Sequence, residues 1–366
     1  MPKFLGSKNY AHGSDSCLGV LITNLGTPEE ASPSAVRKYL AEFLWDPRVV
    51  EIPRPSWWLI LHGIILRTRP SKSAEAYEKV WTDEGSPLLV ISKQQRDALQ
   101  TKLSQLCSGP VKVELAMRYG HPSIASALES LKAQGARRVL LFPLYPQYSA
   151  STTASTFDAV ADVLMKERWM PELRMIKNYG ADIGYINACA QQIQNHWQQN
   201  TRKQKLVFSF HGLPKRNLML GDPYYCECHE TSRLIAEKLN LRKEEWQLTF
   251  QSRFGKAEWL QPYTIKTMEQ LPSEGIKSVD VFCPGFSADC LETLEEISMQ
   301  NRDVYIDAGG ESFSYIPALN AEVSHIDALA NIVMRHTQGW SEASASYTES
   351  DKEAINCRAM ELGAKQ

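Results

Sequence analysis

Apolar runs of strand length alternate with stretches of helical periodicity along most of the chain. Eight runs predict strands, at 17–24, 111–119, 138–145, 173–178, 205–210, 246–251, 278–283 and 303–307. The clearest helical patterns lie at 34–45, 124–134 and 185–200. This alternation predicts parallel sheets that are joined by right-handed crossovers and covered by helices on both faces.

The length of the chain, 366 residues, favours two domains over one. The expected fold class is α/β, with two similar doubly wound domains that each hold a mainly parallel sheet of four strands. The first domain is placed at 17–185 and is completed by a C-terminal helix at about 322–338, and the second is placed at 186–320. Residues 1–16 and 340–366 are expected to be flexible tails.

The most apolar window, residues 57–66, is followed by Arg67 and Arg69. It is about half as long as the roughly twenty residues that span a bilayer. We therefore expect an apolar lip at about 53–70 that touches a membrane surface without crossing it. An ordinary core helix is the alternative interpretation of the same run.

Basic and acidic residues nearly balance, with 40 Lys and Arg against 42 Asp and Glu and a formal net charge of -2. No positive field favours nucleic acid as a partner. Residues 1–16 lack an apolar signal-peptide core, so a cytoplasmic protein with reduced cysteines is expected.

Ligands of doubly wound sheets bind beyond the carboxyl ends of the strands. The residues at these positions are Asn24, Arg118, Tyr119, Tyr145, His211, Gln251 and Gly285. Dinucleotide-binding, P-loop and nucleophile-elbow motifs are missing from the sequence, so the fold class alone indicates no reaction.

His211 leaves an apolar strand and enters a turn, and an acidic helix is expected to begin near Ser287. Asp289, Glu292 and Glu296 would share one face of that helix, which could carry protons or cations. Plainer interpretations also fit, because a strand-end histidine can be a hydrogen-bonded structural residue and acids often serve the helix dipole. Tyr145, Tyr148 and Trp259 can equally be core aromatics.

Cys226, Cys228 and His229 form a short cluster of potential metal ligands. Structural zinc sites require a second ligand pair at a suitable spacing, which this cluster lacks. A reduced surface loop is the better interpretation.

Six segments, in order, resemble motifs of the ferrochelatase family, which inserts ferrous iron into a porphyrin. They are NLGTP at 24–28, EGSPL at 84–88, MRYGHP at 117–122, YPQYSASTT at 145–153, SFHGLP at 209–214 and PGFSADCLETLEE at 284–296. The resemblance covers about residues 17–338. It implies a two-domain chelatase fold with the porphyrin in a cleft between the halves.

The resemblance also implies roles for individual residues. His211 would be the catalytic histidine and Glu292 its acidic partner, both able to contact the metal, while Glu296 and Asp289 would extend a path for protons or metal. The residues expected to bind porphyrin are Asn24, Arg118, Tyr119, Tyr145, Trp259, Trp57, Ile64 and Leu66.

The expected reaction is insertion of Fe(II) into protoporphyrin IX to give protohaem. Residues 24–28 together with the lip resemble the protoporphyrin-using branch of the family more than the coproporphyrin-using branch. A coproporphyrin III enzyme is the closest alternative, and a non-catalytic porphyrin or haem carrier is the alternative from another class. No cofactor is expected to be required, and a [2Fe-2S] cluster is not expected because the segment after Gly339 offers only Cys357. The sequence gives no oligomeric state.

Overall fold

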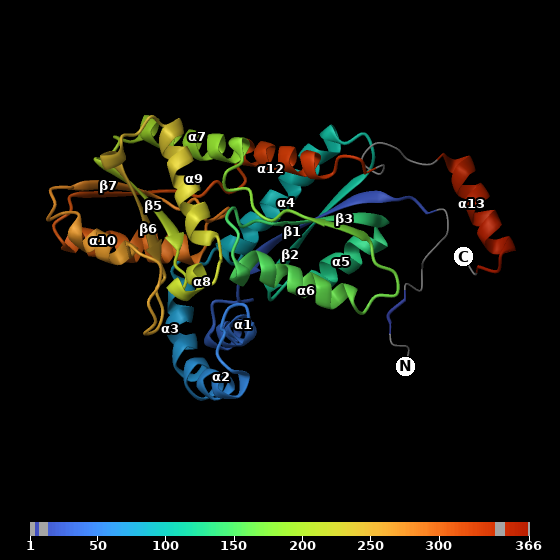
Figure 1. The fold of residues 1–366 in the computed structure, drawn as a ribbon, viewed down its shortest axis with the longest axis horizontal. Helices are drawn as coiled ribbons and strands as arrows, with labels where there is room; N and C mark the ends of the chain where they lie inside the picture. The colour runs from blue at the N-terminus through green and yellow to red at the C-terminus, as the bar shows by residue number, and fades with distance from the viewer. Residues whose placement is uncertain (1–3, 7–13, 341–347, 365–366) are drawn as a thin grey trace.

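The computed structural model of the chain describes residues 4–6, 14–340 and 348–364. Its main strands form two parallel four-stranded sheets with the orders β2-β1-β3-β4 and β6-β5-β7-β8 (Figure 1). The strands are β1 (Cys17–Gly26), β2 (Val111–Tyr119), β3 (Ala136–Pro143), β4 (Glu172–Met175), β5 (Lys205–His211), β6 (Trp246–Gln251), β7 (Ser278–Phe282) and β8 (Ser312–Ile316). The two sheets share one topology, which confirms the predicted doubly wound fold class.

The predicted strand at 303–307 is wrong, because this segment forms helix α11 (Arg302–Asp307) and the last strand is β8. A short apolar run does not by itself distinguish a strand from a buried helical turn. Ile297, Asn301 and Tyr305 are spaced by four residues and are all buried, as the inner face of a helix requires. Gly309, at a φ of +95°, follows this helix and allows the chain to turn into β8.

Helices cover the faces of both sheets (Figure 1). In the first half they are α4 (Pro87–Leu106), α5 (Ile124–Ala133) and α6 (Ser155–Leu164). In the second half they are α8 (Lys215–Met219), α9 (Tyr224–Lys238), the short η3 (Lys243–Glu245), α10 (Thr264–Gln270), the π-helix η4 (Glu292–Asn301) and α11.

Two helices connect the halves, α7 (Ile183–Gln199) and α12 (Val323–His336), which pack against each other along one edge of the molecule (Figure 1). One apolar core continues from the first sheet to the second and includes Ile22 of β1 and Phe208 of β5. Helix α12 also packs against α4, so the chain returns to the first half after the last strand, β8. The domain boundary near residue 185 stays a prediction.

The predicted lip is a helical projection, shown in blue at the bottom of Figure 1. It consists of α1 (Pro33–Trp45), α2 (Arg54–Ile60), the π-helix η1 (Leu61–Ile65) and α3 (Leu66–Glu78). Trp57 and Leu66 are buried inside it, and the Trp57 indole nitrogen donates a hydrogen bond to the Leu44 carbonyl at 2.7 Å. These two residues therefore form the core of the projection and not its outer surface.

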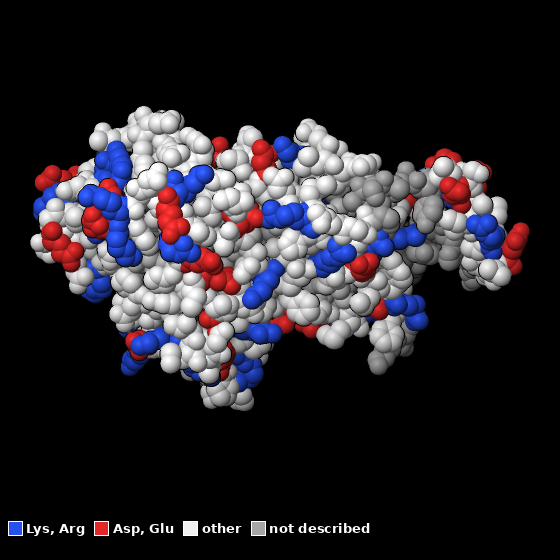
Figure 2. Space-filling view, turned by 45° about the horizontal axis from the view of Figure 1, so that its top comes forward, with Lys and Arg blue, Asp and Glu red and all other residues white. Residues whose placement is uncertain are grey.

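The outer surface of the projection carries the exposed apolar residues Trp58, Leu59, Ile60 and Ile64. Figure 2 shows its tip free of charged side chains, with basic and acidic residues placed closer to the body. No helix in the described part of the chain has both the length and the apolar character needed to cross a membrane.

Parts of the expected tails have defined structure. Trp340 is buried and its indole nitrogen donates to Glu172 at 2.8 Å, so the body extends past Gly339. Helix α13 (Glu349–Glu361) lies apart from the two sheets, and its Lys352 pairs with Asp15 (Figure 1). Residues 1–3, 7–13, 341–347 and 365–366 of the expected tails lie outside the described residues.

Candidate active site

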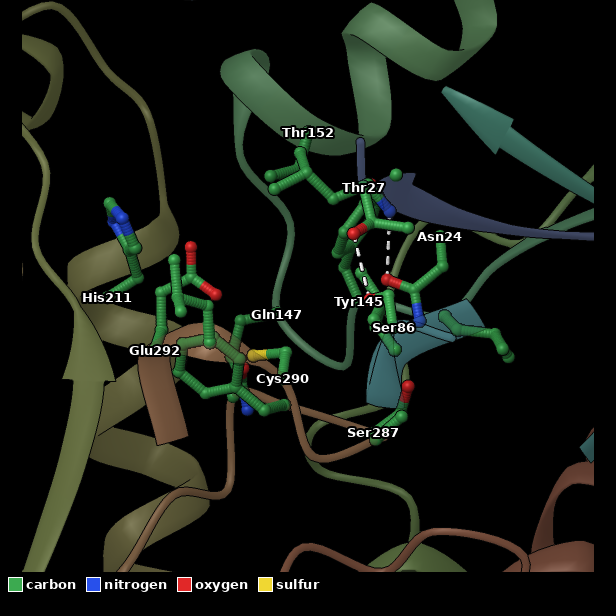
Figure 3. A pocket seen from close by; sticks show the side chains of 18 of the residues that line it. Asn24, Thr27, Ser86, Tyr145, Gln147, Thr152, His211, Ser287, Cys290 and Glu292 are labelled. Carbon is green, nitrogen blue, oxygen red and sulfur yellow. Dashed lines mark hydrogen bonds between the residues drawn. The ribbon is translucent and has the colours of Figure 1, made fainter. Parts of the chain in front are cut away.

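A cavity of about 100 Å³ lies where the carboxyl ends of the two sheets face each other (Figure 3). Asn24 and Tyr145 line it from the first half, and His211 and Gly285 line it from the second. All four lie at or just beyond the carboxyl ends of strands, as expected for ligand sites in doubly wound sheets. The cavity is smaller than the roughly 300 Å³ that small-molecule sites usually reach, so the walls lie close together.

His211 ends β5 and projects into the cavity beside Glu292 (Figure 3). Its Nδ1 lies 2.7 Å from the Gly212 carbonyl oxygen, which can only accept a hydrogen bond. The neutral imidazole therefore carries its proton on Nδ1 and has a lone pair on Nε2. The hydroxyl of Tyr224 donates to the His211 carbonyl at 3.0 Å and fixes the backbone at the same point.

Gly212 is required by the close approach of two loops. A Cβ at this position would lie 2.6 Å from the Gln251 carbonyl oxygen and 3.1 Å from the Trp259 ring. The Gly212 amide donates to that same carbonyl at 2.8 Å. The absence of a side chain thus lets the His211 turn lie directly against the end of β6.

Glu292 and Glu296 come from the π-helix η4, and Glu292 lines the cavity. The Glu296 carboxylate accepts hydrogen bonds from the Ser252 amide at 2.7 Å and the Ser252 hydroxyl at 2.5 Å. Gln251 Nε2 donates to the Glu292 carbonyl at 2.8 Å and to Glu296 at 3.2 Å. Burial raises the pKa of Glu296, although the Ser252 hydrogen bonds and the nearby His211 oppose this.

Asp289 does not share a face with the two glutamates, and that expectation is wrong. The helix begins beside Leu291 and not near Ser287, so Asp289 precedes it. The Asp289 carboxylate accepts hydrogen bonds from Tyr315 at 2.5 Å, Asn320 at 2.8 Å and Thr293 at 2.9 Å. It is buried among these donors and is not part of the cavity lining.

Arg118 and Tyr119 belong to a hydrogen-bond network centred on Asp46. Asp46 accepts from Arg118 at 2.5 Å, from the Tyr119 hydroxyl at 2.8 Å and from Ser155 at 2.6 Å. Burial would raise the pKa of Asp46, but these hydrogen bonds outweigh it and hold the pKa below its ordinary value. Neither Arg118 nor Tyr119 lines the cavity, which differs from the expectation.

The remaining residues expected to bind porphyrin occupy different places. Tyr145 lines the cavity, and its buried hydroxyl has no hydrogen-bond partner among the described residues. The Trp259 ring centre lies 6.5 Å from that of His211. Ile64 is exposed on the projection, whereas Trp57 and Leu66 are inside it.

Sequence reasoning missed Ser252 and Tyr224. Ser252 directly follows the strand-end residue Gln251 and has a φ of +63°, a conformation that the sequence does not signal for serine. Tyr224 is the first residue of α9, and its position after Pro223 indicates a helix start but no site.

The Cys226 to His229 segment lies within helix α9, so the expected surface loop is wrong. Cys226 is exposed and Cys228 is buried, and the two thiols lie on different sides of the helix. In the described ranges, no three His, Cys, Asp or Glu side chains are grouped so that they could hold a metal ion.

The model of the family described as ferrochelatase matches residues 17–337. The chain belongs to the ferrochelatase family. It is 57% identical to a ferrochelatase of Thioalkalivibrio sulfidiphilus, over 99% of this chain and 100% of the relative. It is also 57% identical to a ferrochelatase of Marinobacter nauticus, over 92% and 90% of the two chains.

Ferrochelatases are lyases that insert ferrous iron into a porphyrin, and the family membership gives this chain that activity. Among solved structures, SirB from Bacillus subtilis with Fe3+ resembles the chain with a TM-score of 0.52 at 13% identity, over 91% of this chain and 100% of SirB. That likeness supports the chelatase fold alone. Fe(II) and the porphyrin are the substrates of this ferrochelatase family member, and the expectation that it needs no cofactor stays a prediction.

Proposed function

We propose that the chain inserts Fe(II) into protoporphyrin IX to form protohaem, with His211 as the acceptor of the pyrrole protons. The observation that carries this proposal is the hydrogen bond from His211 Nδ1 to the Gly212 carbonyl, because it leaves the Nε2 lone pair for the substrate. An imidazole with this tautomer is a suitable base near neutral pH.

The proton balance defines what the site must do. Two pyrrole N–H bonds break as one Fe2+ binds four ring nitrogens, so two protons leave for each iron ion that enters. His211 takes each proton at Nε2, and Glu292, next to it in the cavity, receives it for transfer toward Glu296 and solvent (Figure 3). The raised pKa of Glu296 favours this step, because it makes that carboxylate a better proton acceptor than an ordinary glutamate.

His211 and Glu292 are also the proposed contacts of the incoming iron. Imidazole nitrogen and carboxylate oxygen both suit ferrous iron, but nitrogen sites bind later divalent metals more tightly. Zn2+ is therefore expected to be inserted into the same porphyrin. Asp289 is left out of this path, because four protein donors already occupy its carboxylate.

The choice of protoporphyrin IX over coproporphyrin III rests on the charge of the cavity. Protoporphyrin has two propionates, whereas coproporphyrin has four. Among the described residues that line the cavity there is no Lys or Arg, and much of the lining is apolar. Each additional buried propionate would lack a cationic partner and would disfavour binding.

The test compares the two porphyrins as substrates for Fe(II) insertion under identical conditions. We expect kcat/KM for protoporphyrin IX to exceed that for coproporphyrin III by at least about tenfold, which corresponds to one poorly paired charge. Equal values, or a preference for coproporphyrin, would overturn the substrate assignment.

The helical projection is the proposed contact with the cytoplasmic face of a membrane. Trp58, Leu59 and Ile64 are exposed at its tip, and Arg67 lies one turn beyond them. Apolar side chains with a cationic border suit the boundary between headgroups and acyl chains. This contact would place a poorly soluble porphyrin close to the cleft.

Co-sedimentation with anionic liposomes tests the membrane contact. A Trp58→Ser/Ile64→Ser variant should lose most of its binding while keeping its thermal stability. Ile183→Ser, which removes an equally exposed apolar residue on α7, is the matched control and should bind as the wild type does. Unchanged binding of the double variant would refute the proposed contact.

A further inference from the structure

A second hollow lies on the outer surface of the second half, away from the active-site cavity. It is an open groove of about 600 Å³ between α9 and the segment that leads from η3 into β6. Its lining consists of Tyr225, Cys226, His229, Glu230, Arg233, Lys243 and Trp246. Its volume falls within the roughly 300 to 1,000 Å³ typical of small-molecule sites.

One face of α9 supplies two potential metal ligands to this groove. Cys226, His229 and Arg233 are spaced by three and four residues, so they project from the same side of the helix. Cys226 and His229 are both exposed, and Cys226 is a free thiol. The cluster that the sequence singled out is thus divided, with Cys228 buried and the other two facing the groove.

The rest of the lining combines aromatic rings with cations. The Tyr225 and His229 rings lie with their centres 4.5 Å apart, and Trp246 forms the wall beneath Lys243, whose Nζ is 4.1 Å from the ring centre. Arg233 adds a second cation and is paired with Glu237 at 2.8 Å. Glu230 is the one acid in the lining. Such a surface suits a flat, aromatic ligand that carries carboxylates.

We propose that this groove is a second porphyrin site that binds haem, with Cys226 or His229 on the iron and Lys243 and Arg233 near the propionates. Two protein ligands are too few for a free metal ion, and no larger ligand cluster lies in the described ranges. A haem iron already has four nitrogen ligands from its ring, so one cysteine or histidine completes the attachment. The established activity of the family produces this class of ligand.

The groove and the active site share helix α9. Tyr224, the first residue of α9, lines the active-site cavity and donates to the His211 carbonyl, and Tyr225 follows it into the groove. Tyr225 also stacks on Phe250, the residue before Gln251, with ring centres 5.6 Å apart. Haem in the groove therefore lies against the elements that hold His211, and not in the cavity where the iron is inserted.

The test is a titration of the full-length protein with ferric haem, followed by the haem absorption band. We expect two binding phases, and a Cys226→Ser/His229→Ala variant should keep one phase and bind the second haem at least tenfold more weakly. Cys357→Ser, which removes the exposed cysteine on α13, is the matched control and should keep both phases. Metal-free protoporphyrin should bind the groove at least tenfold more weakly than haem, because it lacks the iron.

Three results would overturn the proposal: a single haem phase in the wild type, a second phase unchanged in the double variant, or displacement of the second haem by ATP, which would indicate a nucleotide site. The double variant should insert Zn2+ into protoporphyrin at the wild-type kcat, which shows that it is folded and that the groove is separate from the active site.

Discussion

Gly212 determines the position of the His211 ring, because the backbone of Gln251 leaves no room for a side chain at residue 212. In Gly212→Ala, the new Cβ would overlap the Gln251 carbonyl at 2.6 Å and force the turn outward. A displacement of about 1 Å in a catalytic group can cost about 10²-fold in rate. We expect kcat to fall by about that factor and the free energy of unfolding to fall by about 1 to 3 kcal/mol.

Gly63→Ala in η1 is the control for this prediction. A Cβ at Gly63 would meet no heavy atom within 4 Å. This substitution should leave kcat unchanged and stabilise the protein slightly, by about 0.4 to 1 kcal/mol. A wild-type kcat in Gly212→Ala would show that catalysis does not depend on the present position of the His211 turn.

The proposed role of Glu296 in the proton path opposes the stability of the folded protein. Its pKa is raised in the folded protein, so the folded state holds the proton more tightly than the unfolded state does. Stability is therefore lost as pH rises from the ordinary glutamate pKa, about 4.3, through the raised pKa. Glu296→Gln should be as stable as the wild type at low pH and relatively more stable above this window, while its kcat falls by about 10²-fold. Denaturant unfolding across pH measures the first effect, and a difference in stability that did not change with pH would contradict it.

At the scale of elements, the stability of the projection depends on which residues of α2 and η1 face its core and which face outward. Trp57, Leu61 and Ile65 are spaced by four residues and face inward, whereas Trp58 faces out. Trp57→Ala should lower the free energy of unfolding by about 3 to 5 kcal/mol, because it removes a buried ring and leaves the Leu44 carbonyl without its donor. Trp58→Ala should change stability by less than about 0.5 kcal/mol. Equal losses in the two variants, measured by denaturant unfolding, would contradict this assignment.

The positions of elements with a clear apolar periodicity could be predicted from the sequence. The residue at which helix η4 begins could not. Seven of the eight strands and the spacing of 57, 61 and 65 can be read from the sequence, although the expected lip rests on the apolar content of the run and not on that spacing. The start of η4 beside Leu291 was not predictable, because three donors outside the helix, from Tyr315, Ala318 and Asn320, hold Asp289 before it. Three π-helical segments, η1, η2 (Ala150–Ala154) and η4, lie in the projection or beside the cavity, where such irregular turns often occur.

At the scale of the whole molecule, we expect the projection and the second half to separate when a porphyrin enters, because the active-site cavity of about 100 Å³ is smaller than most small-molecule sites. Contacts that oppose this movement include the 2.7 Å ion pair of Glu51 with Arg216, and Arg69, whose guanidinium lies 4.0 Å from the centre of the Phe254 ring. Both join the projection to loops or helices of the second half.

Arg216→Glu should repel Glu51 and favour the open state. Exposed pairs contribute about 0.2 to 1 kcal/mol, so we expect KM for porphyrin to fall by about two- to fivefold at low salt with kcat unchanged. The effect should disappear at high ionic strength. Lys266→Glu, which breaks the exposed pair with Glu269 on α10, is the control and should leave KM unchanged. An unchanged or higher KM in Arg216→Glu would show that this contact does not limit entry.

The whole-molecule fold was predictable because repeated alternation of strands and helices permits few topologies. The strand-end rule correctly brought Asn24, Tyr145 and His211 to one cavity. The absence of Arg118 from the cavity lining was not predictable, since its position depends on Asp46, a distant residue at the end of α1. Hydrogen-bond networks of this kind depend on tertiary contacts, about which the apolar periodicity of the sequence gives no information.

His211 as the proton acceptor is the central feature of the proposed mechanism. The most direct measurement is the rate of Fe(II) insertion by His211→Ala together with its affinity for protoporphyrin. We expect porphyrin to bind as tightly as it does to the wild type while kcat falls by about 10²- to 10⁴-fold, the usual contribution of a general base. A variant that binds porphyrin and inserts iron at the wild-type rate would contradict the mechanism.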